Sequence, residues 1–97
     1  MSLPLYAVYG VSGCGRGIMP LAREAVVAAG LSPERLVFID DSPASASMNG
    51  QQVCRYEALL ALPASSRHVV IGIANSRIRE KLALRLQADG VQAWSVQ

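Results

Sequence analysis

The stretch LYAVYGVSGCGRG at residues 5–17 places a short apolar run directly before a turn in which four of eight positions are glycine. Continuous apolarity from Leu5 to Tyr9 is typical of a strand that is buried on both faces of a parallel sheet. Glycines permit backbone conformations that other residues avoid, and they let a ligand approach the main chain closely. The stretch therefore predicts a buried strand that turns tightly into the next element.

A helix is expected to follow this turn, starting near Gly17 and ending at Gly30. Pro20 lacks a backbone N–H and fits best in a first turn, which sets the expected start. Glycine is the common residue just beyond a helix, which sets the expected end. The apolar face of this helix is formed by Ile18, Leu21, Ala22, Ala25, Val26 and Ala29.

The remainder of the chain continues to alternate between strands and helices. Strands are expected at residues 35–39, 51–54, 68–73 and 91–96, a polar loop at 42–50, and helices at 56–62 and from Asn75 to Gly90. In the last helix, Ile78, Leu82 and Leu86 are expected to face inward, with Arg77, Arg79, Lys81 and Arg85 mostly outward. This alternation predicts an α/β fold: one small Rossmann-like domain over residues 1–97, with a parallel sheet and helices on both faces.

Composition excludes several classes of protein. The 97 residues are 52% hydrophobic and 16% charged, which is too apolar for a disordered chain. A net charge of +2 does not suggest a partner among nucleic acids or membrane surfaces. There is no apolar run of membrane-spanning length and no signal-peptide pattern at the start, so a cytoplasmic protein is expected. The two cysteines, Cys14 and Cys54, are expected to be free thiols in a reducing compartment.

The glycine turn is a candidate cradle for a diphosphate. The backbone N–H groups at the start of a helix and its partial positive charge suit a phosphate group. The residues of this cradle would be Gly10, Ser12, Gly13 and Gly15. Their pattern is G-x-x-G-x-G, which differs from the dinucleotide fingerprint because Ile18 stands where a third glycine belongs. The alternative is that the glycines only make a tight turn.

Other candidate ligand-binding residues follow the later strands. Asp40 and Asp41 end the second strand, and Asp40 is 23 residues after Gly17, a spacing at which an acid binds ribose hydroxyls in dinucleotide folds. Gly72 lies near the end of the strand expected at 68–73, Ala74 and Asn75 follow it, and all three are expected at the same edge of the sheet. The alternatives are a solvated acidic turn at residues 40–41 and a simple helix cap at Asn75.

Several further side chains could contribute chemistry at or near this edge. Arg77 and Arg79 could reach an anionic ligand or could simply be solvated. Cys14 is either a thiolate stabilised by the helix start or a small residue that fits the turn. His68 is the only histidine, so neither a zinc site nor a Ser-His-Asp hydrolase is expected, and no metal is predicted.

Four segments in register resemble the N-terminal domain of bacterial sugar O- and N-acyltransferases, a family of hexapeptide-repeat enzymes. They are Tyr9-Gly10-Val11-Ser12-Gly13-Cys14-Gly15, Phe38-Ile39-Asp40-Asp41, Ile71-Gly72-Ile73-Ala74-Asn75 and Arg77-Ile78-Arg79-Glu80-Lys81-Leu82. The family includes the sialic-acid O-acetyltransferase type and the UDP-4-amino-sugar N-acetyltransferase type. The resemblance spans nearly the whole chain.

The resemblance implies a Rossmann-like domain that binds a nucleotide-sugar, with a UDP-sugar as the expected partner. In the family a left-handed β-helix follows, binds acetyl-CoA, carries the catalytic histidine and forms trimers. Hexapeptide repeats are not found in these 97 residues, so no catalytic residue is expected here and homotrimers are expected only with the β-helix domain. Acetyl-CoA is expected as a cofactor of the full enzyme and not of this domain. One departure is Cys14, where the family often has histidine; a contact made by that imidazole would be lost.

Two other functions compete with this interpretation. A nicotinamide-dependent oxidoreductase or sensor would suit the fold and Asp40, but the third glycine is absent, and Tyr56 is followed four residues later by Leu60 and not by the lysine that many such enzymes use. A bare interaction domain would need no ligand, and its glycine loop would be only a turn.

Overall fold

A computed structural model describes residues 3–42 and 46–96, and its centre is a six-stranded sheet in the order β3-β4-β2-β1-β5-β6. The strands are β1 (Leu5–Tyr9), β2 (Leu36–Ile39), β3 (Ser47–Met48), β4 (Gln51–Cys54), β5 (Arg67–Ile71) and β6 (Gln92–Ala93). All neighbouring strands are parallel except β3, which pairs with β4 in the antiparallel sense. The predicted α/β fold with a mainly parallel sheet is confirmed.

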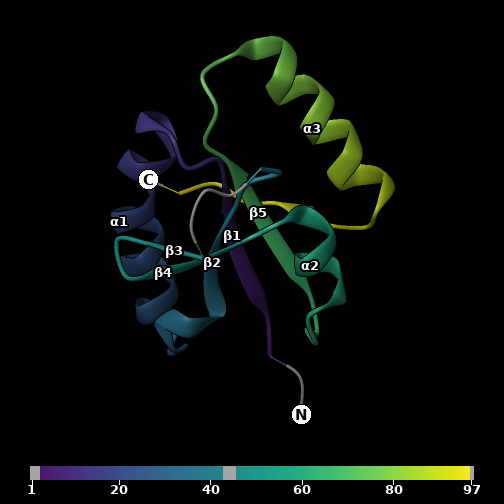
Figure 1. The fold of residues 1–97 in the computed structure, drawn as a ribbon. Coiled ribbons are helices and arrows are strands. Elements are labelled where there is room, and N and C mark those ends of the chain that lie inside the picture. Colours follow the sequence, from purple (N-terminus) through teal and green to yellow (C-terminus); the bar gives the residue numbers. More distant parts are fainter. Residues whose placement is uncertain (1–2, 43–45, 97) are drawn as a thin grey trace.

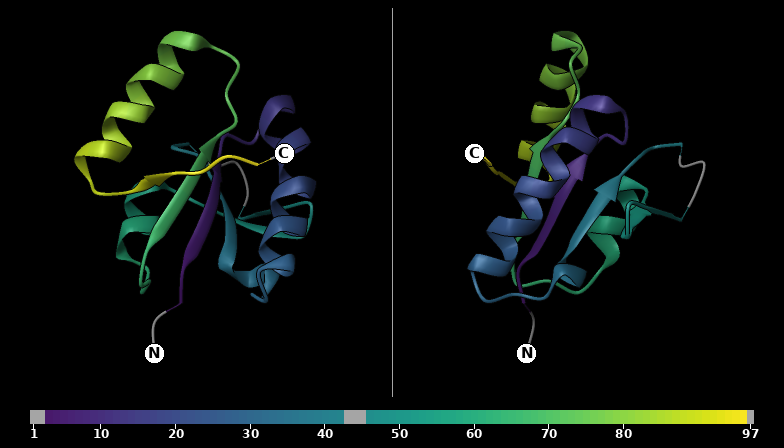
Figure 2. Two further views of the ribbon diagram at one scale, coloured as in Figure 1. Left: turned by 180° about the vertical axis from the view of Figure 1, so that it is seen from behind. Right: turned by 90° about the vertical axis from the view of Figure 1, so that its left-hand side faces the viewer.

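Helices cover both faces of the sheet (Figures 1 and 2). The helix α1 (Gly13–Ala28) lies on one face, where its buried Met19, Ala22 and Val26 pack against Val8 and Phe38 of the sheet. The opposite face carries α2 (Tyr56–Ala61) and α3 (Ser76–Ala88). Their buried side chains pack against Leu5, Ala7, Tyr9, Val37 and Ile39. Alternate residues of β1 therefore serve two separate cores, as the pleat of a strand requires.

The first helix begins earlier than the sequence predicts. It starts at Gly13 and not near Gly17, and Pro20 lies inside it and not in its first turn. Ser12 is extended and its carbonyl oxygen already accepts the N–H of Arg16 at 2.9 Å, so the helix forms directly after it. Pro20 removes one helical hydrogen bond, but both Pro20 and Arg16 are exposed, so water can satisfy the freed carbonyl of Arg16.

Both long helices end as predicted, at glycines in the left-handed conformation. Gly30 has φ of 83° and Gly90 has φ of 70°. In each case the residue after the glycine donates its N–H to a helix carbonyl, Leu31 to Val26 at 3.1 Å and Val91 to Leu86 at 2.9 Å. This six-to-one hydrogen bond is the mark of a Schellman motif.

Four other expectations need correction. Leu21, Ala25 and Ala29 are exposed and so do not belong to the buried face of α1, which is formed by Gly15, Met19, Ala22 and Val26. The loop at 42–50 contains β3, which a turn at Asn49-Gly50 joins to β4; residues 43–45 lie outside the described part. The strand expected at 91–96 is only Gln92–Ala93, because the Val91 N–H completes the end of α3 and Trp94 turns to pack on Tyr6. Ile78 is 44% exposed and not inward-facing, while Leu82 and Leu86 are buried as expected.

None of the helices in residues 3–42 and 46–96 is both long enough and apolar enough to span a membrane.

Candidate functional site

The candidate site lies at the carboxyl edge of the sheet, where β1 is the central strand. β1 pairs with β2 on one side and with β5 on the other, so the loops that leave β1 and β5 diverge to opposite faces at this point. Ligands of open α/β sheets bind at such a switch point. Two hydrogen bonds join the strand ends: the Gly10 N–H donates to the Ile39 carbonyl oxygen and the Gly72 N–H to the Tyr9 carbonyl oxygen, each at 2.8 Å. The loops after β1, β2 and β5 are thereby fixed beside one another.

Three glycines let the backbone segments touch directly at this edge. Gly10 has φ of 120°, which other residues rarely adopt. A Cβ atom on Gly15 would overlap the carbonyl oxygen of Gly10, and one on Gly72 would lie 2.7 Å from the Cα of Gly15. The first turn of α1 therefore rests on the ends of β1 and β5 without any side chain between them. These contacts require glycine at all three positions.

The start of α1 is open to solvent. Ser12 is the N-cap, but its side chain makes no capping hydrogen bond, and the first turn has no acidic residue. Ser12, Gly13 and Cys14 are exposed, and a Cβ atom on Gly13 would meet nothing within 4 Å. The first N–H groups of a helix have no partner within it and carry partial positive charge. The geometry at Ser12, Gly13 and Cys14 thus suits the approach of an anionic group.

The two acids after β2 take different environments. Asp40 continues the sheet, since its N–H donates to the Cys54 carbonyl oxygen at 2.9 Å, and its Oδ1 accepts the N–H of Ser42 at 3.1 Å. Asp41 reaches toward α3, where its Oδ2 accepts the hydroxyl of Tyr9 at 2.8 Å. Tyr9 immediately precedes Gly10, so Asp41 is tied to the start of the glycine loop.

Asn75 is a helix cap, as one of the two interpretations predicts. Its Oδ1 accepts the N–H groups of Arg77 at 3.0 Å and of Ile78 at 3.1 Å. The oxygen is therefore engaged and only its amide NH₂ is left for a ligand. A shallow groove of about 460 Å³ runs from this cap along the outer side of α3. It is lined by Asn75, Arg77, Ile78, Glu80, Lys81 and Leu84.

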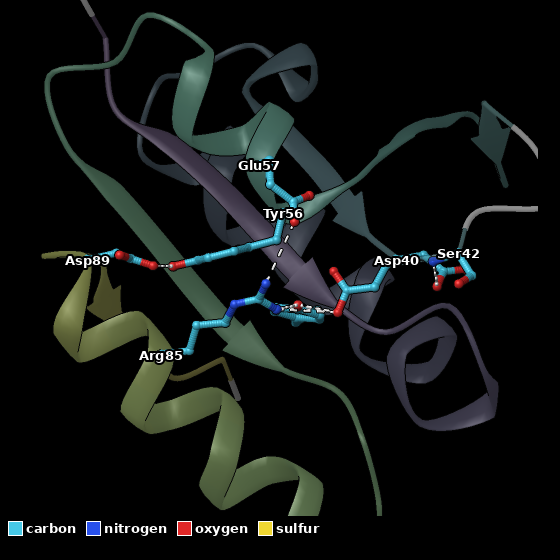
Figure 3. A network of polar contacts seen from close by, with 8 residues as sticks. Asp40, Ser42, Tyr56, Glu57, Arg85 and Asp89 are labelled. Atoms are coloured by element: carbon cyan, nitrogen blue, oxygen red, sulfur yellow. Dashed lines mark hydrogen bonds and ion pairs between the residues drawn. The ribbon is translucent and has the colours of Figure 1, made fainter.

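A polar cluster on the α2 and α3 face of this edge is not predicted by the sequence (Figure 3). Arg85 was expected to point mostly outward, but its Nη1 donates to the Tyr9 hydroxyl at 3.0 Å and lies 3.4 Å from Asp41 Oδ2. Its guanidinium lies 4.5 Å from the centre of the Tyr56 ring, and its Nη2 is 3.7 Å from Glu57 Oε1. Arg85 and Tyr9 are 76 residues apart, so no local spacing marks the contact.

Burial is the main cause of the raised pKa values of the two tyrosines in the cluster. Burial first, and then the hydrogen bond and negative charge of Asp41, raise the pKa of Tyr9 well above its ordinary value. Tyr56 donates its hydroxyl to Asp89 Oδ2 at 2.7 Å, and burial followed by this bond raises the pKa of Tyr56 in the same direction. Both phenols therefore remain donors at neutral pH.

The other chemically active side chains lie in ordinary surroundings. Cys14 and Cys54 are free, with Cys14 exposed and Cys54 buried; burial raises the pKa of the Cys54 thiol. His68 pairs with Ser66 through its Nε2 at 2.8 Å and stacks on Tyr6. Among the described residues, no group of histidine, cysteine and acidic side chains is arranged to hold a metal ion.

Comparisons with known proteins point to sugar acetyltransferases. No family model matches the chain. A curated relative, the GDP-perosamine N-acetyltransferase of Escherichia coli O157:H7, is 27% identical over 92 residues, which cover 95% of the chain and 42% of that protein. The chain thus spans about two fifths of that relative's length.

Two solved structures share the fold. WeeI from Acinetobacter baumannii AYE has a TM-score of 0.90 and 42% identity, over 97% of this chain and 43% of that one. The acetyltransferase domain of PglB from Neisseria gonorrhoeae FA1090, in complex with acetyl coenzyme A, has a TM-score of 0.70 and 28% identity, over 94% of this chain and 42% of that one. The resemblance to the N-terminal domain of the bacterial sugar acyltransferases is confirmed.

Proposed function

We propose that this chain is the nucleotide-sugar-binding domain of an acetyl-CoA-dependent sugar O- or N-acetyltransferase of bacterial surface-glycan synthesis. The observation that carries the proposal is the side-chain-free contact among Gly10, Gly15 and Gly72. It holds the exposed start of α1 against the ends of β1 and β5, and the Gly10 N–H bond to the Ile39 carbonyl oxygen keeps the end of β2 beside them. The candidate diphosphate cradle and the acidic pair would then share one edge. The similarity to named acetyltransferases supports the same function.

In this proposal the diphosphate lies against the start of α1, at Ser12, Gly13 and Cys14. The ribose lies toward the end of β2, where Asp40 or Asp41 accepts its hydroxyl groups. Gly10, Gly15 and Gly72 supply close packing and no side-chain contact. The Asn75 amide is the remaining candidate donor, because the oxygen of that side chain serves the cap.

The contribution of this chain to the reaction would be binding and positioning. Acetyl-CoA, bound by a further part of the full enzyme, would supply the acetyl group, and no residue of this chain is proposed as catalytic. Contacts with the remote nucleotide would hold the sugar amine or hydroxyl in place, which can supply a large part of a rate enhancement. This chain alone is accordingly expected to be inactive in acetyl transfer and, in line with its composition, to work in the cytoplasm.

The expected ligand is a pyrimidine or purine nucleoside diphosphate joined to a sugar. UDP-sugars follow from the resemblance, whereas the curated relative is named for a GDP-sugar. Isothermal titration of the chain with UDP and with GDP tests this ligand class directly, with NAD and acetyl-CoA titrated for comparison. Binding of UDP or GDP is expected. Binding of NAD alone would replace the proposal with a redox domain, and binding of none would favour an interaction domain.

A pair of glycine variants locates the site on α1. Gly13 and Gly17 lie on the same helix, and a Cβ atom at either would meet nothing within 4 Å. Gly13→Val places a branched side chain over the exposed helix start and is expected to weaken nucleotide binding by about tenfold or more, which is about 1.4 kcal/mol. Gly17→Val, one turn further along, is the matched control and should bind normally. Equal affinity of the two variants would rule out a cradle at the start of α1.

A further inference from the structure

The polar cluster between β1, β2 and α3 fixes one oxygen of Asp41 with two donors. Asp41 Oδ2 receives the Tyr9 hydroxyl at 2.8 Å, and Arg85 Nη1 lies 3.4 Å away. Arg85 also donates to the oxygen of that hydroxyl at 3.0 Å. Side chains from β1, from the loop after β2 and from α3 thus form a closed triangle, although the side chain of Asp41 is 50% exposed.

Arg85 is itself held in place from the opposite side. Its guanidinium stacks over the Tyr56 ring, Glu57 lies beside it, and Tyr56 is anchored to Asp89 at the end of α3 (Figure 3). The Tyr9 and Tyr56 rings also stack, with centroids 5.8 Å apart. A guanidinium stacked on an aromatic ring loses little freedom when it makes each further contact.

The ion pair between Arg85 and Asp41 by itself adds little to fold stability. Ion pairs between exposed groups contribute only about 0–1 kcal/mol, and both Arg85 and Asp41 remain well exposed. What the triangle does achieve is a fixed direction for a surface carboxylate. With Oδ2 engaged, Oδ1 has no partner among the described residues and is left to accept from a ligand. Because Tyr9 directly precedes Gly10, the fixed carboxylate keeps its place relative to the glycine loop.

We propose that Tyr9 and Arg85 are positioning residues, which orient Asp41 to accept the ribose hydroxyls of the bound nucleotide. This inference rests on the proposed function and selects Asp41 over Asp40 as the acid that recognises ribose. Asp40 is the weaker candidate because its side chain bonds to the Ser42 N–H two residues away, and no side chain from another described element fixes its direction. Neither Tyr9 nor Arg85 needs to touch the ligand.

The test compares a nucleoside diphosphate with its 2′,3′-dideoxy analogue. The full chain and its variants are titrated with both forms of UDP, or of GDP if the chain prefers that base. Tyr9→Phe is expected to weaken binding of the ribose form about tenfold, the lower end of what one hydrogen bond to a charged group contributes, and to leave binding of the dideoxy form unchanged. Tyr6→Phe is the matched control, since it removes the hydroxyl of the other tyrosine of β1, whose ring packs on His68 and Trp94 and not on the cluster.

A second pair of variants tests Arg85. Arg85→Lys keeps a positive charge near Asp41 but loses the stacked guanidinium, so it should retain part of the preference for ribose, whereas Arg85→Gln should lose it. The inference would be overturned if the variants lost equal affinity for both forms of the nucleotide. It would also be overturned if Tyr9→Phe lost no affinity for the ribose form while the unmodified chain prefers that form. In either case the proposed function would still stand. If neither UDP nor GDP binds the unmodified chain, the proposed function and this inference fail together.

Discussion

At the scale of single residues, the glycines of this fold perform two different tasks. Gly10, Gly15 and Gly72 are required by packing, because any Cβ atom would meet backbone within 3.0 Å. Gly13 and Gly17 face open space, so they are not required by packing at all. A sequence pattern cannot distinguish the two groups, because the segments that pack against each glycine are known only from the structure.

This difference predicts opposite effects of two alanine substitutions on one helix. Gly15→Ala should lower the free energy of unfolding by about 2 kcal/mol or more, since backbone must move to admit the methyl group. Gly17→Ala should raise it by up to about 1 kcal/mol, because alanine favours the helix and restricts the unfolded chain. Urea unfolding of both variants measures the two values. A Gly15→Ala chain as stable as the parent would show that the close contact at Gly10 is not tight.

At the scale of elements, variants of Asn75, the N-cap of α3, can distinguish a structural role of this residue from a ligand-binding one. Asn75→Ala removes the acceptor of two backbone N–H groups and should cost about 1 kcal/mol in urea unfolding. Asn75→Ser retains a capping oxygen and should keep most of that stability, although it lacks the amide donors. Titration of Asn75→Ser with the nucleotide then measures the contribution of the Asn75 amide group to binding affinity. Unchanged affinity would leave Asn75 a cap alone.

Local patterns predict most elements of the fold, and their failures have physical causes. β1, β2, β4 and the ends of α1 and α3 follow from apolar runs and from glycines at helix ends. β3 is only Ser47–Met48, too short for a periodic pattern; its signal is Asn49-Gly50, where positive φ at both residues gives a tight hairpin. The expected start of α1 is wrong because the rule for proline assumes that every helical carbonyl needs a partner within the helix. Arg16 and Pro20 are exposed, so water can bond to the carbonyl that Pro20 leaves free.

The candidate site is predictable only in part. The glycine loop, the acidic pair and Asn75 each follow a strand, so the rule for open α/β sheets places them at one edge. The cluster around Arg85 does not follow any such rule, because its members come from β1, the loop after β2, α2 and α3. An arginine in a polar, helical pattern looks solvated in the sequence. Only the packing of α3 against the sheet brings it over Tyr56.

At the scale of the whole molecule, the two faces of the sheet have different chemistry. The α1 face is an apolar core apart from Gln51, whose Nε2 donates to the Leu36 carbonyl oxygen and whose Oε1 accepts from Arg23. The α2 and α3 face carries two buried tyrosines whose hydroxyls are bonded to carboxylates. This second face makes overall stability sensitive to alkaline pH.

The sign of that dependence follows from the pKa values of Tyr9 and Tyr56, which are both raised in the folded chain above the ordinary value of 10.0. Near and above pH 10 the unfolded chain loses these protons and the folded chain keeps them, so the free energy of unfolding falls as pH rises. Each tyrosine contributes a slope of at most about 1.4 kcal/mol per pH unit. Urea unfolding of the parent and of Tyr56→Phe between pH 8 and 11 measures this slope. The free energy of unfolding of the variant should fall less steeply with pH than that of the parent. Identical slopes would show that Tyr56 ionises as readily in the folded chain as in the unfolded one.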